Sequence, residues 1–435
     1  RYIAVVEERQ LEQFANRGYD VLDKIRALDP SVSLSMSIGI GRGARTLREA
    51  QDMAEHALDM AQGRGGDQAA EMTLDGFTFY GGVSHGVEKR SKVRSRLVAD
   101  QLVKLIKEAD HVVIMGHRMS DLDAIGAAEG VLRICKICDV PAVIAVRRDA
   151  TLAASLIDAL CKAGQKDDFI DPKDALPIIS KRTLCIVVDT YQAGLVESKD
   201  ILEKCGKVAV IDHHRKGVGY IENPALVCHE PYSSSASELV TELLQYVGER
   251  DDKPNRVEAE GLLAGILLDT QDFTLHTGVR TFEAAAALRR YGAETERVRR
   301  LFDVTMVEYN AKADLVEKAQ MYKNCAISIG GEVAPEARVA IAQAANDLLR
   351  IQGVDASFVA VQVGNGVNVS ARSMGAVNVQ VIMESLGGGG HQTMAAAQLK
   401  HITPQAARSR IQDAIDQYYL SQKKTTPEAR PAKGE

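Results

Sequence analysis

Short runs of aliphatic and β-branched residues alternate with longer amphipathic segments over the middle of the chain. Four such runs are HVVIMG (111–116), PAVIAV (141–146), TLCIVVD (183–189) and KVAVID (207–212). Runs that are apolar at nearly every position are typical of strands buried on both faces of a sheet, and the helical patterns between them indicate parallel connections. Helical patterns continue over 261–270 and 282–290. The pattern therefore predicts an α/β fold built on a doubly wound parallel sheet.

Smaller α/β patterns lie on either side of this central region. Before it we expect a strand at 2–6, a helix at 11–28, a strand at 33–41 and a helix at 47–62. After it, a charged helical stretch at 294–323 precedes the strand AISIG, a hairpin over 357–373 turned at Gly364-Asn365-Gly366, and a helix at 404–419.

These patterns predict three domains. They are a small α/β unit at 1–80, a larger α/β domain at 101–300 and a smaller α/β domain at 325–422. A polar linker at 81–100 and a helical linker at 301–324 join them, and the tail at 423–435, rich in Pro, Lys and Glu, is expected to be disordered.

Composition and charge narrow the class of protein. The chain has 435 residues with 46% hydrophobic and 26% charged, an ordinary globular composition. Its net charge of −6 argues against binding of long nucleic acid, because proteins that bind long nucleic acid carry an excess of basic residues. The chain contains no run of 18 apolar residues, so the sequence predicts no membrane span within it. Because Arg1 leads directly into an apolar stretch, we expect the chain to be part of a longer protein.

The seven cysteines are scattered, as expected of thiols in a reducing cytoplasm. Cys135 and Cys138 form a lone C-x-x-C motif without a second pair. We expect them to be buried helix cysteines rather than zinc ligands.

Acidic and histidine residues follow the predicted strands at the edge where open α/β sheets place their active sites. Asp189 follows the third run, and Asp269 follows GILL in a helical pattern. The remaining members are His117, Asp121 and Asp123 after the first run, and Asp212, His213 and His214 at the end of the fourth. Each aspartate taken alone is readily explained as a helix cap, but caps do not explain the coincidence of four segments.

Carboxylates and imidazoles in one cluster are typical of a dinuclear metal site. This mixture suits Mn²⁺, Fe²⁺ or Zn²⁺, whereas Mg²⁺ prefers oxygen ligands and water, so the histidines favour manganese over magnesium. Two such ions can generate a hydroxide and stabilise both oxygens of a phosphoryl displacement. The cluster therefore predicts hydrolysis of a small anionic phosphate ester.

The strings GHRMSDLDAIGAA, VVDT, VIDHH and GILLDTQDF resemble the four motifs of the DHH phosphoesterase superfamily, in order. The resemblance implies that His117, Asp121 and Asp189 hold one metal and that Asp123, Asp189, His213 and Asp269 hold the second. Asp189 would be the bridge. Asp212 and His214 would orient a ligand or contact the phosphate.

Farther on, NVSARSMGAVNVQVIMESLGGGGHQTMAAAQL is similar to the DHH-associated C-terminal domain of that family. The implied substrate-binding residues are Ser370, Arg372, Ser373, Gly388, Gly389, Gly390 and His391. Arg372 offers a forked cation for phosphate, and the glycines permit close approach of a backbone. His391 is also a candidate proton donor, so the implied catalytic residues are His214, Asp212 and His391, with the active site in a cleft between the two domains.

The first segment resembles the second half of a degenerate GGDEF domain, through SMSIGIGRG and ALDMAQGRGGDQAAEM. The order GGDEF-like, DHH, DHH-associated is that of the membrane-anchored cyclic-di-AMP phosphodiesterases of the GdpP type. This resemblance implies hydrolysis of cyclic di-AMP to linear pApA with two Mn²⁺, a homodimer, and a longer protein held at the cytoplasmic face of the membrane by helices that this soluble fragment lacks. No GG[DE]EF string is present, so we expect no cyclase activity.

Two alternatives remain open. Stand-alone DHH proteins that act as short-oligonucleotide exonucleases or pAp phosphatases share every metal motif, although they lack the GGDEF-like segment. A non-catalytic nucleotide sensor is the alternative of another class, and the complete set of candidate ligands argues against it.

Overall fold

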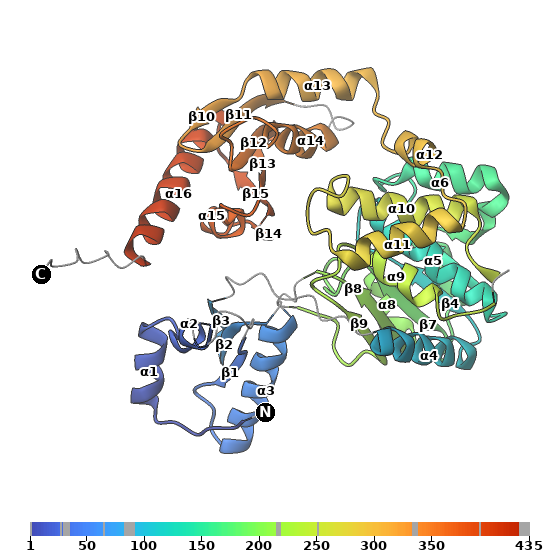
Figure 1. The fold of residues 1–435 in the computed structure, drawn as a ribbon, viewed down its shortest axis with the longest axis horizontal. Coiled ribbons are helices and arrows are strands. Elements are labelled where there is room, and N and C mark those ends of the chain that lie inside the picture. Colours follow the sequence, from blue (N-terminus) through green and yellow to red (C-terminus); the bar gives the residue numbers. More distant parts are fainter. Residues whose placement is uncertain are drawn as a thin grey trace, which may run out of the picture. The chain divides into compact units, whose positions relative to one another are not determined.

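The computed structural model describes residues 2–26, 28, 35–63, 66–81, 92–214, 219–249, 252–332, 338–390 and 393–425. The chain divides into two units, Arg1–Phe302 and Asp303–Glu435 (Figure 1).

The first unit begins with a small three-stranded sheet. Its helices are α1 (Glu8–Asn16), α2 (Val21–Arg26) and α3 (Leu47–Gly63), and its strands are β1 (Ile38–Gly41), β2 (Gln68–Thr73) and β3 (Gly76–Gly81). β1 pairs with β2 in parallel, and β2 pairs with β3 as an antiparallel hairpin.

Three predictions for this segment were wrong in detail. Residues 2–6 form no strand, since they pair with no described strand and Tyr2 is 99% exposed. The helix predicted over 11–28 is broken where Gly18 and Tyr19 adopt left-handed φ angles of 62° and 54°. The predicted strand at 33–41 is described only from residue 35 and is paired only over β1, while the β2–β3 hairpin was not predicted.

The second sheet is the doubly wound parallel sheet that the apolar runs predict. Its strands are β4 (Val112–Met115), β5 (Ala142–Ala145), β6 (Phe169–Ile170), β7 (Leu184–Val188), β8 (Lys207–Asp212) and β9 (Leu226–His229), in the order β6-β5-β4-β7-β8-β9 and all parallel. The four runs are β4, β5, β7 and β8, and the two edge strands β6 and β9 were not predicted.

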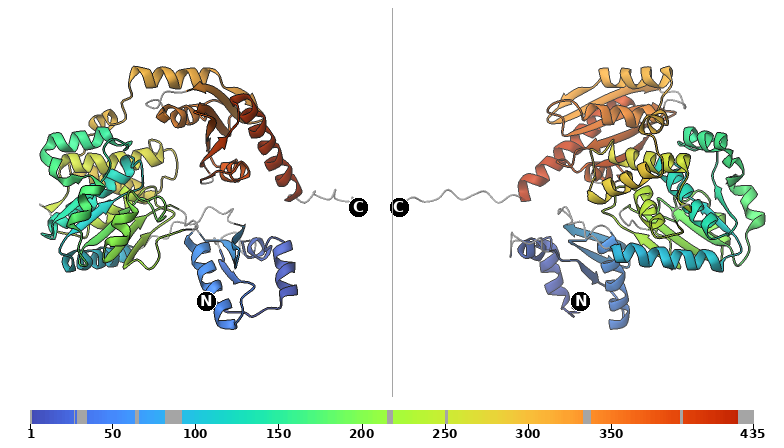
Figure 2. Two further views of the ribbon diagram at one scale, coloured as in Figure 1. Left: turned by 180° about the vertical axis from the view of Figure 1, so that it is seen from behind. Right: turned by 45° about the vertical axis from the view of Figure 1, so that its right-hand side comes forward.

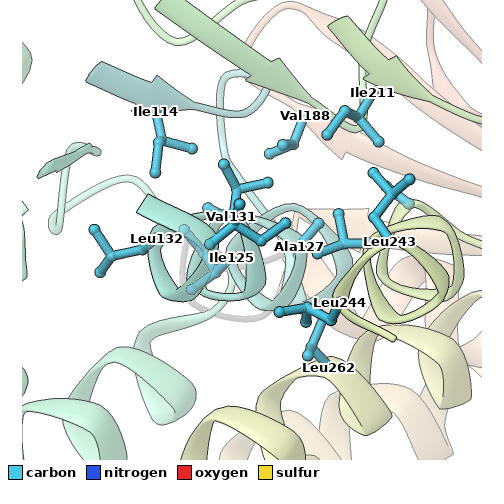
Figure 3. Packing of buried hydrophobic residues seen from close by; sticks show 14 of the residues in the cluster. Ile114, Ile125, Ala127, Val131, Leu132, Val188, Ile211, Leu243, Leu244 and Leu262 are labelled. Atoms are coloured by element: carbon cyan, nitrogen blue, oxygen red, sulfur yellow. The ribbon is translucent and has the colours of Figure 1, made fainter. Parts of the chain in front are cut away.

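Helices cover both faces of this sheet because alternate strand residues point to opposite sides. The helices of this region are α4 (Lys92–Glu108), α5 (Leu122–Ile137), α6 (Ala154–Leu160), α7 (Pro172–Ala175), α8 (Lys199–Lys204), α9 (Ala236–Leu244), α10 (Arg256–Thr270), α11 (Val279–Arg290) and α12 (Thr295–Arg300). On one face Ile114, Val188 and Ile211 pack with α5, α9 and α10 (Figure 3). On the other face Val113, Val187 and Val210 form a smaller cluster that includes residues of α7 and α8.

The contact between α5 and α10 depends on glycine. A Cβ atom at Gly126 would lie 2.5 Å from the carbonyl oxygen of Gly261, closer than real Cβ contacts. The two helices can therefore approach each other at this point only because Gly126 has no side chain.

The second unit is a mixed sheet with helices on both faces. It contains α13 (Met306–Glu317), β10 (Gln320–Tyr322), β11 (Cys325–Glu332), α14 (Arg338–Leu348), β12 (Ala356–Val363), β13 (Gly366–Ser373), α15 (Val379–Ser385), β14 (Gly389–Gly390), β15 (Met394–Lys400) and α16 (Pro404–Thr425). The strand order is β10-β11-β12-β13-β15-β14, and only β11 and β12 pair in parallel. Residues of α15 and α16 pack on one face and residues of α14 on the other (Figure 2).

The predicted hairpin is confirmed as β12 and β13, with Val363 opposite Gly366 and Gly364 at a left-handed φ of 57°. The helix predicted over 294–323 was wrong as one element, because it is divided into α12 and α13 and ends in strand β10. Residues 423–425 of the expected tail belong to α16, and 426–435 lie outside the described residues.

Cys135 is buried in α5 as expected, whereas Cys138 at the end of that helix is partly exposed, and no cysteine is paired in a disulfide. Within the described part of the chain, every helix is too short or too polar to cross a lipid bilayer.

Candidate metal centre

The predicted metal ligands come from four segments of the first unit. His117 and Asp189 lie just beyond the ends of β4 and β7, and His213 follows Asp212, the last residue of β8. Asp121 caps α5, and Asp123 lies in its first turn. Asp269 comes from the last turn of α10 rather than from a strand. The parallel order β4-β7-β8 explains why the strand-borne residues meet at one edge.

The side chains of these residues converge. Asp189 Oδ2 is 3.4 Å from His117 Nε2, and Asp189 Oδ1 is 3.4 Å from His213 Nε2. His213 Nε2 is also 3.1 Å from Asp269 Oδ2 and 3.9 Å from Asp123 Oδ2, while His117 Nε2 is 3.8 Å from Asp121 Oδ1. These distances give the clusters of potential ligands His117–Asp121–Asp189 and Asp123–Asp189–His213–Asp269, which share Asp189. A third group, Asp189–His213–His214, overlaps the second.

The donors fit divalent cations. Asp189 Oδ1 and His213 Nε2 are buried and have no hydrogen-bond partner among the described residues. An unsatisfied carboxylate oxygen and imidazole nitrogen that face each other are costly unless something positively charged lies between them. A cluster of three carboxylates and one imidazole offers four ligand atoms and matches a transition-metal site better than a magnesium site.

Neighbouring groups orient the two histidines. His117 Nδ1 lies 2.9 Å from the carbonyl oxygen of Arg118, and His213 Nδ1 lies 3.3 Å from that of Ser233. In the neutral imidazole that a metal ion would bind, an Nδ1–H that donates to a carbonyl leaves the lone pair on Nε2, the atom that faces the carboxylates.

Asp123 is held by the N-terminus of α9. Its carboxylate accepts hydrogen bonds from the backbone N–H groups of Ala236, at 2.7 Å, and Ser237, at 2.8 Å. A Cβ atom at Gly265 on α10 would lie 2.6 Å from Asp123 Oδ1, so glycine leaves the space that this carboxylate fills.

Several of the carboxylates and imidazoles in these clusters are close together and buried, and both effects shift their pKa values. Burial raises the pKa of Asp123, and the Asp189 and Asp269 carboxylates raise it further. Burial alone would raise the pKa of Asp189, but the imidazoles of His117 and His213 beside it bring it well below its usual range. Burial alone would lower the pKa of His117, but Asp121 and Asp189 raise it to about 12. The protein thus concentrates negative charge where a cation would offset it.

Asp212 and His214 lie beside this cluster. His214 Nδ1 donates to Asp212 Oδ1 at 2.8 Å and is 3.5 Å from Asp189 Oδ1. His229 Nε2 in turn lies 2.5 Å from the backbone oxygen of His214. His229 is not among the candidate residues named from the sequence, and the signal that would have found it is its place at the end of β9, a strand that was not predicted.

The second unit brings the other candidate residues onto neighbouring strands. Ser370, Arg372 and Ser373 lie on β13, which pairs with β15, and β15 pairs with Gly389 and Gly390 of β14. Gly388 directly precedes β14, and a Cβ atom there would clash with the backbone of Ala396. His391 lies outside the described residues.

The guanidinium of Arg372 makes fewer hydrogen bonds within the described chain than it has N–H groups. Its Nη1 donates to Ser370 Oγ at 3.1 Å and to the Ala371 carbonyl at 2.9 Å, but its buried Nε has no hydrogen-bond partner among the described residues. Burial lowers the pKa of this guanidinium to about 10. No ion pair with a described carboxylate offsets its charge, so the guanidinium is suited to an incoming anion.

Comparison with known proteins finds three domain matches along the chain. Residues 111–266 match the N-terminal domain of the DHH family. Residues 1–75 match the GGDEF domain of GdpP-like cyclic-di-AMP phosphodiesterases, and residues 334–420 match the DHHA1 domain. The chain thus combines a GdpP-like GGDEF domain with the DHH and DHHA1 domains.

Relatives of known name agree with this assignment. The chain is 44% identical over 427 residues to the cyclic-di-AMP phosphodiesterase GdpP of Geobacillus thermodenitrificans, covering 96% of this chain but 65% of the relative. It is 27% identical over 341 residues to the bifunctional oligoribonuclease and PAP phosphatase NrnA of Thermus thermophilus, covering 75% of this chain and 95% of that one.

Among solved structures, an exopolyphosphatase-related protein from Bacteroides fragilis has a TM-score of 0.64 at 19% identity, over 75% of this chain and 98% of its own. That likeness supports the fold.

Proposed function

We propose that this chain is a metal-dependent phosphodiesterase that hydrolyses cyclic di-AMP to linear pApA. The single observation that carries the proposal is the pair of ligand clusters that share Asp189, with unsatisfied atoms on Asp189 and His213. The choice of substrate is supported by the GdpP-like GGDEF match and by the named relative that is 44% identical.

We assign two Mn²⁺ to this centre. His117, Asp121 and Asp189 would hold one, and Asp123, Asp189, His213 and Asp269 the other. When bound, the ions would supply a hydroxide nucleophile and stabilise the charge that develops on the phosphate.

The protein groups have separate tasks in this proposal. Asp189 contributes one oxygen to each ligand cluster, so it sets the spacing between them. Asp212 accepts the Nδ1 proton of His214 and fixes the tautomer and orientation of that imidazole beside Asp189. His214 and His391 are the candidate proton donors, and Arg372, Ser370, Ser373 and the glycines 388–390 bind the part of the nucleotide that does not react.

The test is hydrolysis of cyclic di-AMP, cyclic di-GMP and pApA, side by side, by the purified chain with Mn²⁺ and without added metal. We expect metal-dependent conversion of cyclic di-AMP to pApA. Turnover of pApA alone would instead support the second candidate, a short-oligonucleotide exonuclease or pAp phosphatase, which the similarity to NrnA over 95% of that protein favours. Tight binding of cyclic di-AMP without turnover of any of the three would indicate a nucleotide sensor.

The whole protein is a further part of the proposal. Because the chain spans 65% of the length of the GdpP relative, we propose that the complete protein is anchored at the cytoplasmic face of the membrane, as the resemblance implies. Fractionation of cells that express the whole gene tests this. The homodimer rests on the resemblance alone, and light scattering on the purified chain tests it.

A further inference from the structure

The segment that follows Asp269 has a backbone conformation that side-chain-bearing residues rarely adopt. Gln271, Asp272 and Phe273 are all left-handed, with φ of 47°, 57° and 63°. For a residue as bulky as phenylalanine this is an outlier. Strain of this kind persists only where surrounding structure enforces it, and it clusters at active sites and ligand clamps.

Thr270 enforces this turn. Its buried hydroxyl donates to the Ile266 carbonyl at 2.7 Å and accepts from the backbone N–H of Phe273 at 3.0 Å. Its carbonyl accepts from the N–H groups of Thr274 and Leu275, both at 2.8 Å. Phe273 lies four positions after the candidate ligand Asp269, so their Cα atoms are at most about 14 Å apart. The turn therefore holds the backbone of Phe273 within that distance of the candidate ligand Asp269.

Phe273 stacks on Phe282 of α11. Their ring centroids are 5.3 Å apart with an interplanar angle of 24°. Phe273 is partly buried and packs against the main core, whereas Phe282 is 56% exposed. A single exposed phenylalanine is ordinary. Here the exposed ring is supported by a partner whose position is fixed by a strained turn.

The helix that carries Phe282 is also firmly placed. The hydroxyl of Thr281 donates to Glu238 at 2.7 Å, and Arg280 binds Glu242 through two hydrogen bonds of 2.7 and 2.6 Å. Both contacts join α11 to α9, the helix whose N-terminus holds Asp123. The aromatic pair and the metal ligands are thus parts of one framework.

We propose that Phe273 and Phe282 form a stacking platform for a nucleobase of the substrate, while the reacting phosphodiester lies at the carboxylate–histidine centre. This assignment rests on the proposed function and adds a base subsite to it. A phenyl ring offers neither charge nor hydrogen bonds to phosphate or ribose, but its face suits a flat purine. Because every base has such a face, the platform gives affinity for bases without choosing between adenine and guanine.

The first experiment uses the absence of tryptophan from the chain. Phe282→Trp introduces a single indole at the platform, and its fluorescence is titrated with AMP and with ribose 5-phosphate at a constant concentration of Mn²⁺. We expect AMP to quench the emission and ribose 5-phosphate to leave it unchanged. The matched control is Leu97→Trp on α4, a position that is also 56% exposed, where neither ligand should act. Equal responses to both ligands at position 282, or no response to AMP, would overturn the platform.

The second experiment separates stacking from packing. In Phe282→Ala and Phe282→Leu the KM for cyclic di-AMP should rise about tenfold with a smaller change in kcat, while Phe282→Tyr stays within about threefold of the unmodified chain. A KM for Phe282→Leu close to that of Phe282→Tyr would mean that the position needs only apolar bulk, and the platform would be wrong. If the unmodified chain does not cleave cyclic di-AMP, the proposed function fails and the fluorescence titration alone decides the platform.

Discussion

Among single residues, Asp189 is the one on which both metal positions depend. It belongs to each cluster of potential ligands found in the described part of the chain, and its φ of 58° is left-handed. Asp189→Asn keeps the shape but removes the charge shared by the two clusters. We expect bound manganese to fall from about two ions per chain to below one, with activity reduced by more than about a hundredfold. Elemental analysis of the purified variant measures the metal content.

The comparison variant is Asp123→Ala, which removes a member of one cluster only. It should lose about one ion and keep the other. Asp123 also accepts two hydrogen bonds from the N-terminus of α9. The melting temperature of the Asp123→Ala variant is therefore measured as well, to separate loss of metal from loss of stability. Two ions at full occupancy in Asp189→Asn would show that Asp189 is not the bridge.

Glu129 on α5 gives a prediction about pH and stability. Its side chain is fully buried, and burial together with the nearby Glu258 raises the pKa of its carboxyl to about 8. The folded state therefore binds a proton more tightly than the unfolded state, so stability should fall as pH rises from about 4.5 to 8. Glu129→Gln should raise the free energy of unfolding by up to about 4 kcal/mol at pH 7.5 and by under about 1 kcal/mol at pH 5.

Urea unfolding at the two pH values measures this difference. The control is Glu296→Gln on α12, where the side chain is exposed and no gain is expected at either pH. An equal effect of Glu129→Gln at pH 5 and pH 7.5 would mean that the carboxyl does not titrate in this range.

Arg372 allows a separate test of the second unit. Removing its buried guanidinium should weaken binding of cyclic di-AMP by tenfold or more, because a charged hydrogen bond contributes about 1.5 to 3 kcal/mol. Arg372→Ala should retain its full metal content, and Arg350→Ala, 76% exposed on the same unit, should bind normally. An unchanged KM in Arg372→Ala would contradict the role, provided chemistry is slow enough for KM to report binding.

At the scale of elements, the crossing of α5 and α10 sets the distance between the candidate ligands that these helices carry. A side chain at Gly126 would meet the carbonyl of Gly261 at 2.5 Å. Gly126→Ala should therefore lower the free energy of unfolding by about 1 to 3 kcal/mol, the usual result of overpacking. Urea unfolding measures it, and Gly194→Ala, whose Cβ would meet nothing within 4 Å, is the control. Equal stability of the two variants would show that the helices can move apart without cost.

The sequence could predict the central strands of the large parallel sheet but not its two edge strands. The strands β4, β5, β7 and β8 are buried on both faces, so their composition alone distinguishes them. β6 has two residues, and β9 forms without a long apolar run, because pairing to β5 and β8 stabilises them. Residues 2–6 are apolar but pair with no described strand, which shows that hydrophobicity without a partner does not define a strand.

The candidate centre was easier to predict than the loops around it. Parallel topology brings residues from the ends of β4, β7 and β8 to one edge, so their convergence follows from the order of the strands. Asp269 comes from a helix and Phe282 from another, and no strand rule locates them. The stacking of Phe273 on Phe282 depends on a left-handed turn, whose cause is the hydrogen bonding of Thr270 rather than any local residue preference.

At the scale of the whole molecule, the proposed first domain, residues 1–80, contributes none of the candidate ligands. Its buried residues form clusters of their own, such as Leu11, Tyr19 and Leu22 with Ile40 and Ala69. The large parallel sheet has a separate core. A separate core is what a domain that folds alone requires.

A chain that begins at Val83 should therefore fold, bind two ions and cleave cyclic di-AMP within about tenfold of the full chain, a barrier change below roughly 1.4 kcal/mol. This start preserves all of α4, whose Arg94 and Ser95 contact Glu230 and Glu242. If the first domain only stabilises its neighbour, the shortened chain melts at a lower temperature with the same kcat. If the first domain controls closure over the substrate, kcat and KM change together while metal content stays the same. A shortened chain that is folded and holds two ions but has no turnover would refute a self-contained catalytic unit.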